Sequence, residues 1–196
     1  MNAPPGKKRA LLFLGSPRPH GNSESLAEAF GACLYGRGWE TSKRRAITAL
    51  GSPSEMQALV QDVWTADLVV LSSPLYADGV PSVVLRVFEE IIAARPGGAE
   101  RPSGQRPGMI VIFNCGFPEA HQNTVALEIC RLFAREAGFH WSGGMSMGMG
   151  EILGGRSLEQ AGRKVRPVLE ALNLAALALT QGSDIPEEAV KLMARF

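Results

Sequence analysis

Three short apolar runs, each ending in turn residues, most constrain the fold of this chain. They lie within residues 9–14, 67–72 and 109–113. A continuous apolar run of this length is typical of a strand buried on both faces, as in a parallel sheet. Between the runs, apolar residues recur every three or four positions, which predicts helices. Strands that alternate with helices predict an α/β fold with a parallel sheet and right-handed crossovers.

Helical periodicity begins at Ser23, where one face carries Leu26, Ala29, Phe30, Cys33 and Leu34. Further helices are expected at 54–64 with Ser54 as cap, from Pro81 to Ile92, at 125–137, at 157–180 and at 185–196. The apolar face of the helix at 125–137 is expected to hold Val125, Ile129, Cys130, Phe133 and Ala137.

Two weaker segments complete a five-stranded sheet. A strand at 39–47 contains Lys43, Arg44 and Arg45, which is typical of a sheet edge. A last strand begins at 139–142 and leads into a Gly/Met-rich loop at 143–155. Five strands and about five helices match the strand order 2-1-3-4-5 with helices on both faces, in which ligands bind at the carboxyl ends of the first and third strands.

The composition is that of one soluble domain. The 196 residues carry a net charge of +1, so no long-range field attracts nucleic acid or a membrane. We expect a single domain over 1–196, with a loose tail at 1–6 and an amphipathic C-terminal helix at 184–196. The N-terminal apolar run is too short for a signal peptide or a membrane span. The three cysteines (Cys33, Cys115, Cys130) are widely spaced, which favours a reducing cytoplasm over a disulfide framework.

The loop after the first run, residues 15–23, reads GSPRPHGNS. Its two glycines let the backbone curl so that N–H groups point inward, and the following helix adds the positive end of its dipole. Further donors come from Ser16, Arg18, Asn22 and Ser23. These features predict a phosphate-binding loop. The alternative is an ordinary turn in which Asn22 or Ser23 caps the helix.

A nucleoside triphosphatase loop does not fit this segment. That motif, GxxxxGK[ST], needs a lysine after its second glycine, where this chain has Asn22. The strand at 68–71 also runs into Ser72 and Ser73, with no aspartate to hold magnesium.

Residues 15–25 and 74–81 together resemble the NADPH-dependent FMN reductase family of flavodoxin-like proteins. The first stretch fits GSPRxxGNS, and the second, PLYADGVP, fits P-[IL]-Y-x-x-x-x-P. The resemblance covers most of the first 120 residues and is looser after about residue 140. It implies a flavodoxin-like five-stranded parallel sheet that binds FMN.

The resemblance also implies roles for particular residues. The first motif implies that the FMN phosphate is bound by Ser16, Arg18, Asn22 and Ser23. The second implies that the flavin is wrapped by Pro74, Leu75, Tyr76, Asp78 and Gly79. The loop after the fourth strand is implied to flank the ring through Asn114, Cys115 and Gly116. Residues 45–65 hold no cysteine, so the iron–sulfur cluster of some relatives is not expected, nor any other metal.

The implied function is an FMN-dependent oxidoreductase that passes hydride from NAD(P)H through FMN to a small acceptor, such as a quinone or an azo compound. An electron carrier of the same fold is an alternative that the near-neutral charge disfavours. A non-enzymatic binding module is another, disfavoured by the intact first motif. Family members commonly dimerise, so we expect a homodimer or a higher homo-oligomer, with the C-terminal apolar stripe docked on the partner or on its own subunit.

Several residues keep two interpretations. Tyr76 either covers the flavin or packs on the next helix, and Cys115 is either a redox thiol or a small buried filler. The Gly/Met-rich loop either faces a planar ligand or plugs the core. The three histidines are expected to be solvated or capping, and the arginine-rich loop at 95–108 to be solvated at the opposite end of the sheet.

Overall fold

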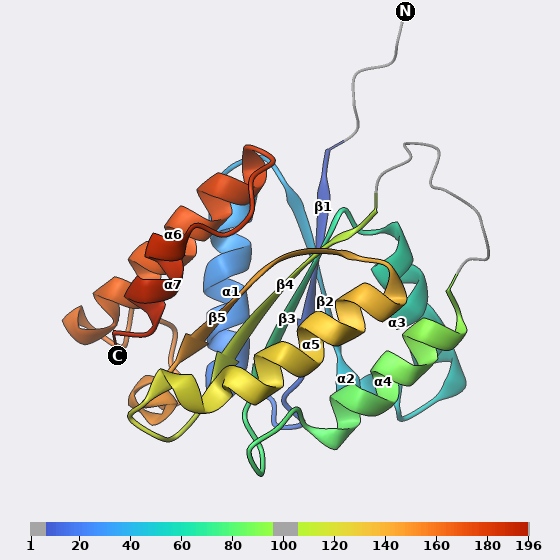
Figure 1. Cartoon of the computed structure of the whole chain (residues 1–196), viewed down its shortest axis with the longest axis horizontal. Coiled ribbons are helices and arrows are strands. Elements are labelled where there is room, and N and C mark those ends of the chain that lie inside the picture. The colour runs from blue at the N-terminus through green and yellow to red at the C-terminus, as the bar shows by residue number, and fades with distance from the viewer. Residues whose placement is uncertain (1–6, 96–105, 196) are drawn as a thin grey trace, which may run out of the picture.

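The computed structural model describes residues 7–95 and 106–195, which form a five-stranded parallel sheet with helices on both faces (Figure 1). The strand order is β2-β1-β3-β4-β5, as the sequence predicts. The strands are β1 (Arg9–Leu14), β2 (Glu40–Arg45), β3 (Leu68–Pro74), β4 (Gly108–Asn114) and β5 (His140–Met147).

The two faces of the sheet bury separate apolar layers. One face is covered by α1 (Asn22–Tyr35), α6 (Arg166–Thr180) and α7 (Glu187–Met193). The other is covered by α2 (Ala46–Ala49), α3 (Pro53–Thr65), α4 (Ser82–Ala93) and α5 (Thr124–Ala137). Successive strand residues serve opposite layers: Leu12 packs toward α1, and Phe13 toward α4. Because both faces are covered, the central strands must be apolar throughout, which explains their continuous hydrophobic runs.

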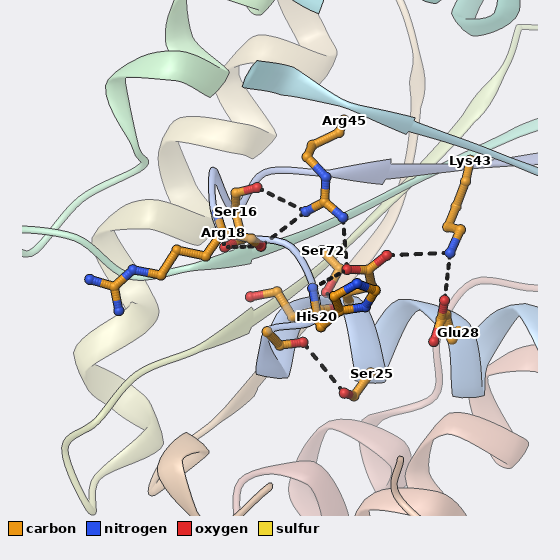
Figure 2. A network of polar contacts seen from close by, with 11 residues as sticks. Ser16, Arg18, His20, Ser25, Glu28, Lys43, Arg45 and Ser72 are labelled. Carbon is orange, nitrogen blue, oxygen red and sulfur yellow. Dashed lines mark hydrogen bonds and ion pairs between the residues drawn. The ribbon is translucent and has the colours of Figure 1, made fainter. Parts of the chain in front are cut away.

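Strand β2 is an edge strand, as its basic residues predict. It pairs with β1 on one side only, and most of its residues are exposed. Its carboxyl end, at Arg45, lies beside the loop that follows β1 (Figure 2).

Three details of the predicted helices are wrong. Ser52, not Ser54, caps α3, because its hydroxyl accepts the Glu55 amide at 3.2 Å. Pro81 is the residue before α4 rather than its first residue. Val125 is 59% exposed, and Ala126 takes its place on the buried face of α5.

The region after residue 142 also differs from the prediction. Strand β5 continues to Met147, and Met145 and Met147 are fully buried, so the first part of the Gly/Met-rich segment belongs to the core. The predicted helix at 157–180 begins only at Arg166. Gly162, with φ +83°, sets the chain into a left-handed conformation just before the short 3-10 helix η3 (Arg163–Val165), which a continuous helix cannot accommodate.

The C-terminal apolar stripe docks on its own subunit. Ala189, Leu192 and Met193 are buried in the layer formed with α6. The Ile185 amide bonds to the Ser142 carbonyl at 2.9 Å, which ties the segment to β5. Asp184 does not cap α7; its carboxylate lies 2.8 Å from His140 Nε2.

The predicted loose tail at 1–6 and most of the arginine-rich loop at 95–108 lie outside the described residues. Arg95 and Arg106, at the ends of that loop, are exposed. Among the described residues, no helix is long and apolar enough to cross a membrane. The same part of the chain holds no group of three or more side chains that could bind a metal ion.

Candidate functional site

The carboxyl ends of β1, β3 and β4 are joined by hydrogen bonds. The Gly15 amide donates to the Ser72 carbonyl at 2.8 Å, and the Ser72 hydroxyl donates to the Ser23 carbonyl at 2.7 Å. The Ser23 hydroxyl in turn donates to Asn114 Oδ1 at 2.7 Å, and both residues are buried. The loops after the first, third and fourth strands therefore converge on one edge of the sheet, as the strand order predicts.

Helix α1 begins with free amides at this edge. Ser25 is the first residue whose amide bonds back along the chain, to the Gly21 carbonyl at 3.1 Å. The amides of Asn22, Ser23 and Glu24 thus have no acceptor among the described residues, as at any helix N-terminus without a capping side chain. Gly21 occupies the cap position with no side-chain bond, so neither Asn22 nor Ser23 acts as the cap.

The four residues predicted to bind the phosphate do not all point toward the same place. Ser16 is buried, and its hydroxyl bonds within the loop to both the amide and the carbonyl of Arg18, each at 3.2 Å. Asn22 Oδ1 accepts the Gly155 amide at 2.8 Å. The Arg18 side chain is exposed and extends away from the polar network in Figure 2. Ser16, Asn22 and Ser23 therefore gather at the loop, and the Arg18 guanidinium does not.

An ion-pair network lies behind the loop. Arg45 Nη2 is 2.7 Å from Glu24 Oε2, and the His20 amide donates to the same oxygen at 2.7 Å. Lys43 Nζ lies 3.3 Å from Glu24 Oε1 and also pairs with Glu28 (Figure 2). Burial alone would raise the pKa of Glu24, but the hydrogen bonds from Arg45 and from the His20 amide outweigh it and lower the pKa from 4.5 to about 2. Glu24 is thus an ionised, largely buried carboxylate in the first turn of α1.

A cavity of about 230 Å³ lies beside this network. Its basic residues, Lys43, Arg44 and Arg45, are all paired with carboxylates, which belong to Glu24, Glu28, Glu55 and Asp62. Since these charges compensate one another, the cavity is a poor site for an anion, and the open amides of α1 are the better one.

The loop after β3 forms a tight turn. Tyr76 and Gly79 exchange both backbone hydrogen bonds, at 3.1 and 3.0 Å. The central residues, Ala77 and Asp78, have φ of +46° and +59°, as a type I′ turn requires. The turn is anchored by the Leu75 amide, which donates to the Asn114 carbonyl at 2.9 Å.

Every predicted flavin-wrapping residue of this loop lies at the site edge. Tyr76 is 41% exposed, which favours the interpretation that it covers a ligand over the one in which it packs on the next helix. Pro74 pairs with Asn114 in the sheet, and Asp78 is exposed at the tip of the turn.

The loop after β4 is tied to the loop after β5. Gly150 donates its amide to the Cys115 carbonyl at 2.8 Å, and Met149 donates to the Phe117 carbonyl at 2.7 Å. The Cys115 side chain is buried, and its Sγ accepts the Asn123 side-chain amide at 3.4 Å. This environment supports the interpretation of Cys115 as a buried filler. Gly116 is exposed beside it.

Backbone strain concentrates in these loops. The non-glycine residues with positive φ in residues 7–95 and 106–195 are His20, Ala77, Asp78 and Met149. All four lie in loops that follow strands at the same end of the sheet. Such conformations cost about 1–3 kcal/mol each and cluster at ligand-binding sites.

Three features of the candidate site were not predicted from the sequence. Arg45 was interpreted only as an edge-strand charge, Glu24 was not singled out, and the Asn22–Gly155 bond joins residues far apart in the chain. The position of Arg45 at the end of a strand next to β1 is the one sequence signal that could have placed it near the loop.

Comparison with known proteins agrees with this fold. Residues 9–176 match the NADPH-dependent FMN reductase family. The match covers most of the chain, and the chain belongs to this family. Its members are oxidoreductases that combine FMN with a nicotinamide electron donor, as the two motifs predicted.

Particular relatives are more distant. An FMN-dependent NADH:quinone oxidoreductase from Marinomonas sp. (strain MWYL1) is 32% identical over 91 residues, which are 46% of this chain and 42% of that protein. An NADH:FMN oxidoreductase in its apo form has 16% identity and a TM-score of 0.66, and the match covers 94% of each chain. An NAD(P)H:quinone oxidoreductase from Methanothermobacter marburgensis has 16% identity and a TM-score of 0.61, covering 89% of this chain and 98% of the other. At these identities the two structures support the fold alone.

Proposed function

We propose that this chain binds FMN at the converging loops and catalyses the oxidation of NAD(P)H with transfer of electrons to a small planar acceptor. The observation that carries the proposal is the open N-terminus of α1, which lies against the ends of β3 and β4 through Ser72 and Asn114. Bound FMN would accept hydride from NAD(P)H and pass electrons on.

The phosphate would be held by the backbone amides of Asn22, Ser23 and Glu24 and by the side-chain amide of Asn22. The hydroxyls of Ser16 and Ser23 lie beside them, and each would have to give up its present bond, to the Arg18 carbonyl or to Asn114 Oδ1, in order to donate to the phosphate. Hydrogen bonds to a charged group contribute about 1.5–3 kcal/mol each. Two net bonds would give about 4 kcal/mol, so FMN should bind about a thousandfold more tightly than riboflavin, which lacks the phosphate.

The ring would lie between the loops after β3 and β4. Amides of both loops are candidates to stabilise negative charge on the reduced ring. Those of Tyr76, Gly79 and Cys115 already bond to backbone carbonyls, which leaves Ala77, Asp78 and Gly116 without an acceptor among the described residues.

The acceptor would contact exposed apolar side chains at the same edge. Tyr76, Phe117 and Met149 are 41%, 51% and 45% exposed. Side chains of this kind suit a flat apolar molecule, since aromatic rings stack and the methionine thioether adapts to their shape. Both a quinone and an azo compound fit that description. The Marinomonas relative's name favours the quinone.

The absorbance spectrum of the purified protein tests the central claim. We expect the protein to be yellow as purified, or to retain one FMN per chain after incubation with FMN and gel filtration. It should also oxidise NADPH or NADH in the presence of a quinone. A protein that stays colourless after incubation with excess FMN would overturn the proposal.

The electron carrier remains the alternative. A carrier would hold FMN but would not turn over a nicotinamide under air. FMN binding with no measurable NAD(P)H oxidation, with either nucleotide and with quinone or azo acceptors, would favour the carrier.

A homodimer remains part of the proposal, supported now by the family alone. The C-terminal stripe is used within its own subunit and no longer argues for a partner. Light scattering at micromolar concentration should give a mass of two chains or more.

A further inference from the structure

We propose that Arg45 is a positioning residue for the FMN phosphate, which turns the carbonyl groups of the β1–α1 loop away from the phosphate and neutralises Glu24 beside it. The inference rests on the proposed FMN site. It concerns a residue outside the phosphate-binding motif, on the neighbouring edge strand.

Arg45 bonds to the loop at two carbonyls. Its Nη1 donates to the Ser16 carbonyl at 3.2 Å and to the Arg18 carbonyl at 3.1 Å. Figure 2 shows the Arg45 guanidinium between these groups and the start of α1. One side chain from β2 therefore holds two carbonyl groups of the loop.

The two carbonyls belong to peptide groups that no amide can orient. Ser16 precedes Pro17, and Arg18 precedes Pro19, so neither peptide carries an N–H. A peptide group is normally oriented by bonds to both its N–H and its C=O. In these two peptide groups only the carbonyl can form a hydrogen bond, and Arg45 donates to both carbonyls. The Ser16 hydroxyl adds the second bond to the Arg18 carbonyl.

Carbonyl oxygens that faced the phosphate would repel it. Because Arg45 holds both carbonyls on its own side, the opposite side of the loop presents the amides that begin α1. The loop has few other means to reach this orientation, since the amides of Gly15, Arg18 and His20 are already bonded to Ser72, Ser16 and Glu24.

Arg45 also removes a charge conflict. Glu24 is in the first turn of α1, and its side chain is 7% exposed. An ionised carboxylate there would oppose an anion bound to the same helix N-terminus. The 2.7 Å pair with Arg45 compensates that charge, with a further contribution from Lys43.

Arg44 offers a matched control. It is the next residue on β2, and its side chain pairs with Asp62 at 2.7 Å and with Glu55 at 3.6 Å. Among the described residues it forms no hydrogen bond or ion pair with residues 15–23. Arg44→Met and Arg45→Met thus remove the same charge from neighbouring positions, and only the second touches the loop.

The test is a fluorescence-quenching titration of FMN and of riboflavin with the wild type and four variants. Arg45→Met should weaken FMN binding at least tenfold and change riboflavin binding less than twofold. Arg44→Met should leave the ratio of the two affinities unchanged. Arg45→Lys keeps the charge beside Glu24 and should fall between Arg45→Met and the wild type. Arg45→Met/Glu24→Gln removes both charges and should recover part of the lost FMN affinity.

The outcomes separate this inference from the proposed function. A wild type that binds both flavins equally would overturn the phosphate site and the inference with it. A wild type that prefers FMN, with Arg45→Met keeping that preference, would overturn the inference alone. If Arg45→Met weakens both flavins equally, or if it does not fold and Arg45→Lys keeps the wild-type ratio, then Arg45 serves the fold and not the phosphate, and the inference is wrong.

Discussion

The loops after β1 and β3 face the same edge of the sheet and are built by opposite means. The β1–α1 loop is held from outside by Arg45, Ser72 and Asn114. The β3–α4 turn is held mainly by its own two backbone bonds between Tyr76 and Gly79. A loop fixed by side chains from several elements presents a rigid set of donors, which suits the small charged phosphate. The exposed turn has fewer bonds to other elements, so it is the part of the site that can adapt to a flat ring and to more than one acceptor.

The largest expected difference between the two loops is in how substitutions there change stability at low pH. The lowered pKa of Glu24 means that its ionised form stabilises the folded state fully above about pH 4.5, and that this contribution is lost as the pH falls toward 2. A shift of that size corresponds to at most about 3 kcal/mol. In urea unfolding, the stability difference between the wild type and Glu24→Gln should therefore shrink from pH 7 to pH 2.

Asp78→Asn in the exposed turn is the control for this titration. Asp78 has no ion pair within the described part of the chain, so Asp78→Asn leaves the ion pairs of Glu24 with Lys43 and Arg45 in place at every pH. An equal dependence in both variants would mean that the first loop is not stabilised by its charge network.

Glycine-to-alanine substitutions, which add one methyl group, should also affect the stability of the protein differently in the two loops. A Cβ at Gly15 would lie 2.5 Å from Ser73 Oγ and 2.8 Å from Val84 Cγ2, whereas one at Gly79 would approach nothing closer than 3.9 Å. Overpacking of this kind costs about 1–3 kcal/mol. Gly15→Ala should lower the free energy of unfolding by that amount, and Gly79→Ala by less than about 0.5 kcal/mol. Similar losses in denaturant titrations of both variants would contradict the comparison.

Ser23→Ala should sharpen the assignment of the phosphate to the first loop. The substitution removes a hydroxyl that donates to Asn114 Oδ1 in this structure and that would turn to the proposed phosphate when FMN binds. The loss of one hydrogen bond to a charged group, about 1.5 kcal/mol, should weaken FMN about tenfold and leave riboflavin nearly unchanged. Asn22→Ala, which also releases Gly155, should act in the same direction. Equal weakening of both flavins would show that these residues shape the fold only.

Cys115→Ser should have the smallest effect. The side chain is buried against Asn123, and a serine there fits with little change in volume. Flavin chemistry requires no thiol, so turnover of NAD(P)H should persist at least in part. Complete loss of turnover with FMN still bound would instead give Cys115 a catalytic role.

Much of the fold could be predicted because its signals are local. The apolar runs at 9–14, 67–72 and 109–113 identified the three central strands, since a strand covered on both faces has no polar positions. The boundaries failed where local signals compete. The glycines and methionines of β5 look like a loop in sequence, and the segment at 157–165 has helical residues but is broken at Gly162.

The loops of the candidate site could be predicted as well, and their partners could not. The content of residues 15–23 and 74–81, with the strand order, places both at one edge of the sheet. The bonds of Ser23 to Asn114 and of Asn22 to Gly155 join residues far apart along the chain, and no spacing rule predicts such pairs.

The strand order, the family and the loops that converge at one edge of the sheet could be predicted from the sequence, because periodicity and turn chemistry act over a few residues. Only the folded chain shows that Arg45 reaches the loop after β1, that Glu24 is a buried, ionised side chain and that the C-terminal helix docks on its own subunit. Each of these outcomes depends on which surfaces the folded sheet brings together. The residues next to a charged or apolar side chain in the sequence do not indicate which distant residue it will contact in the folded protein.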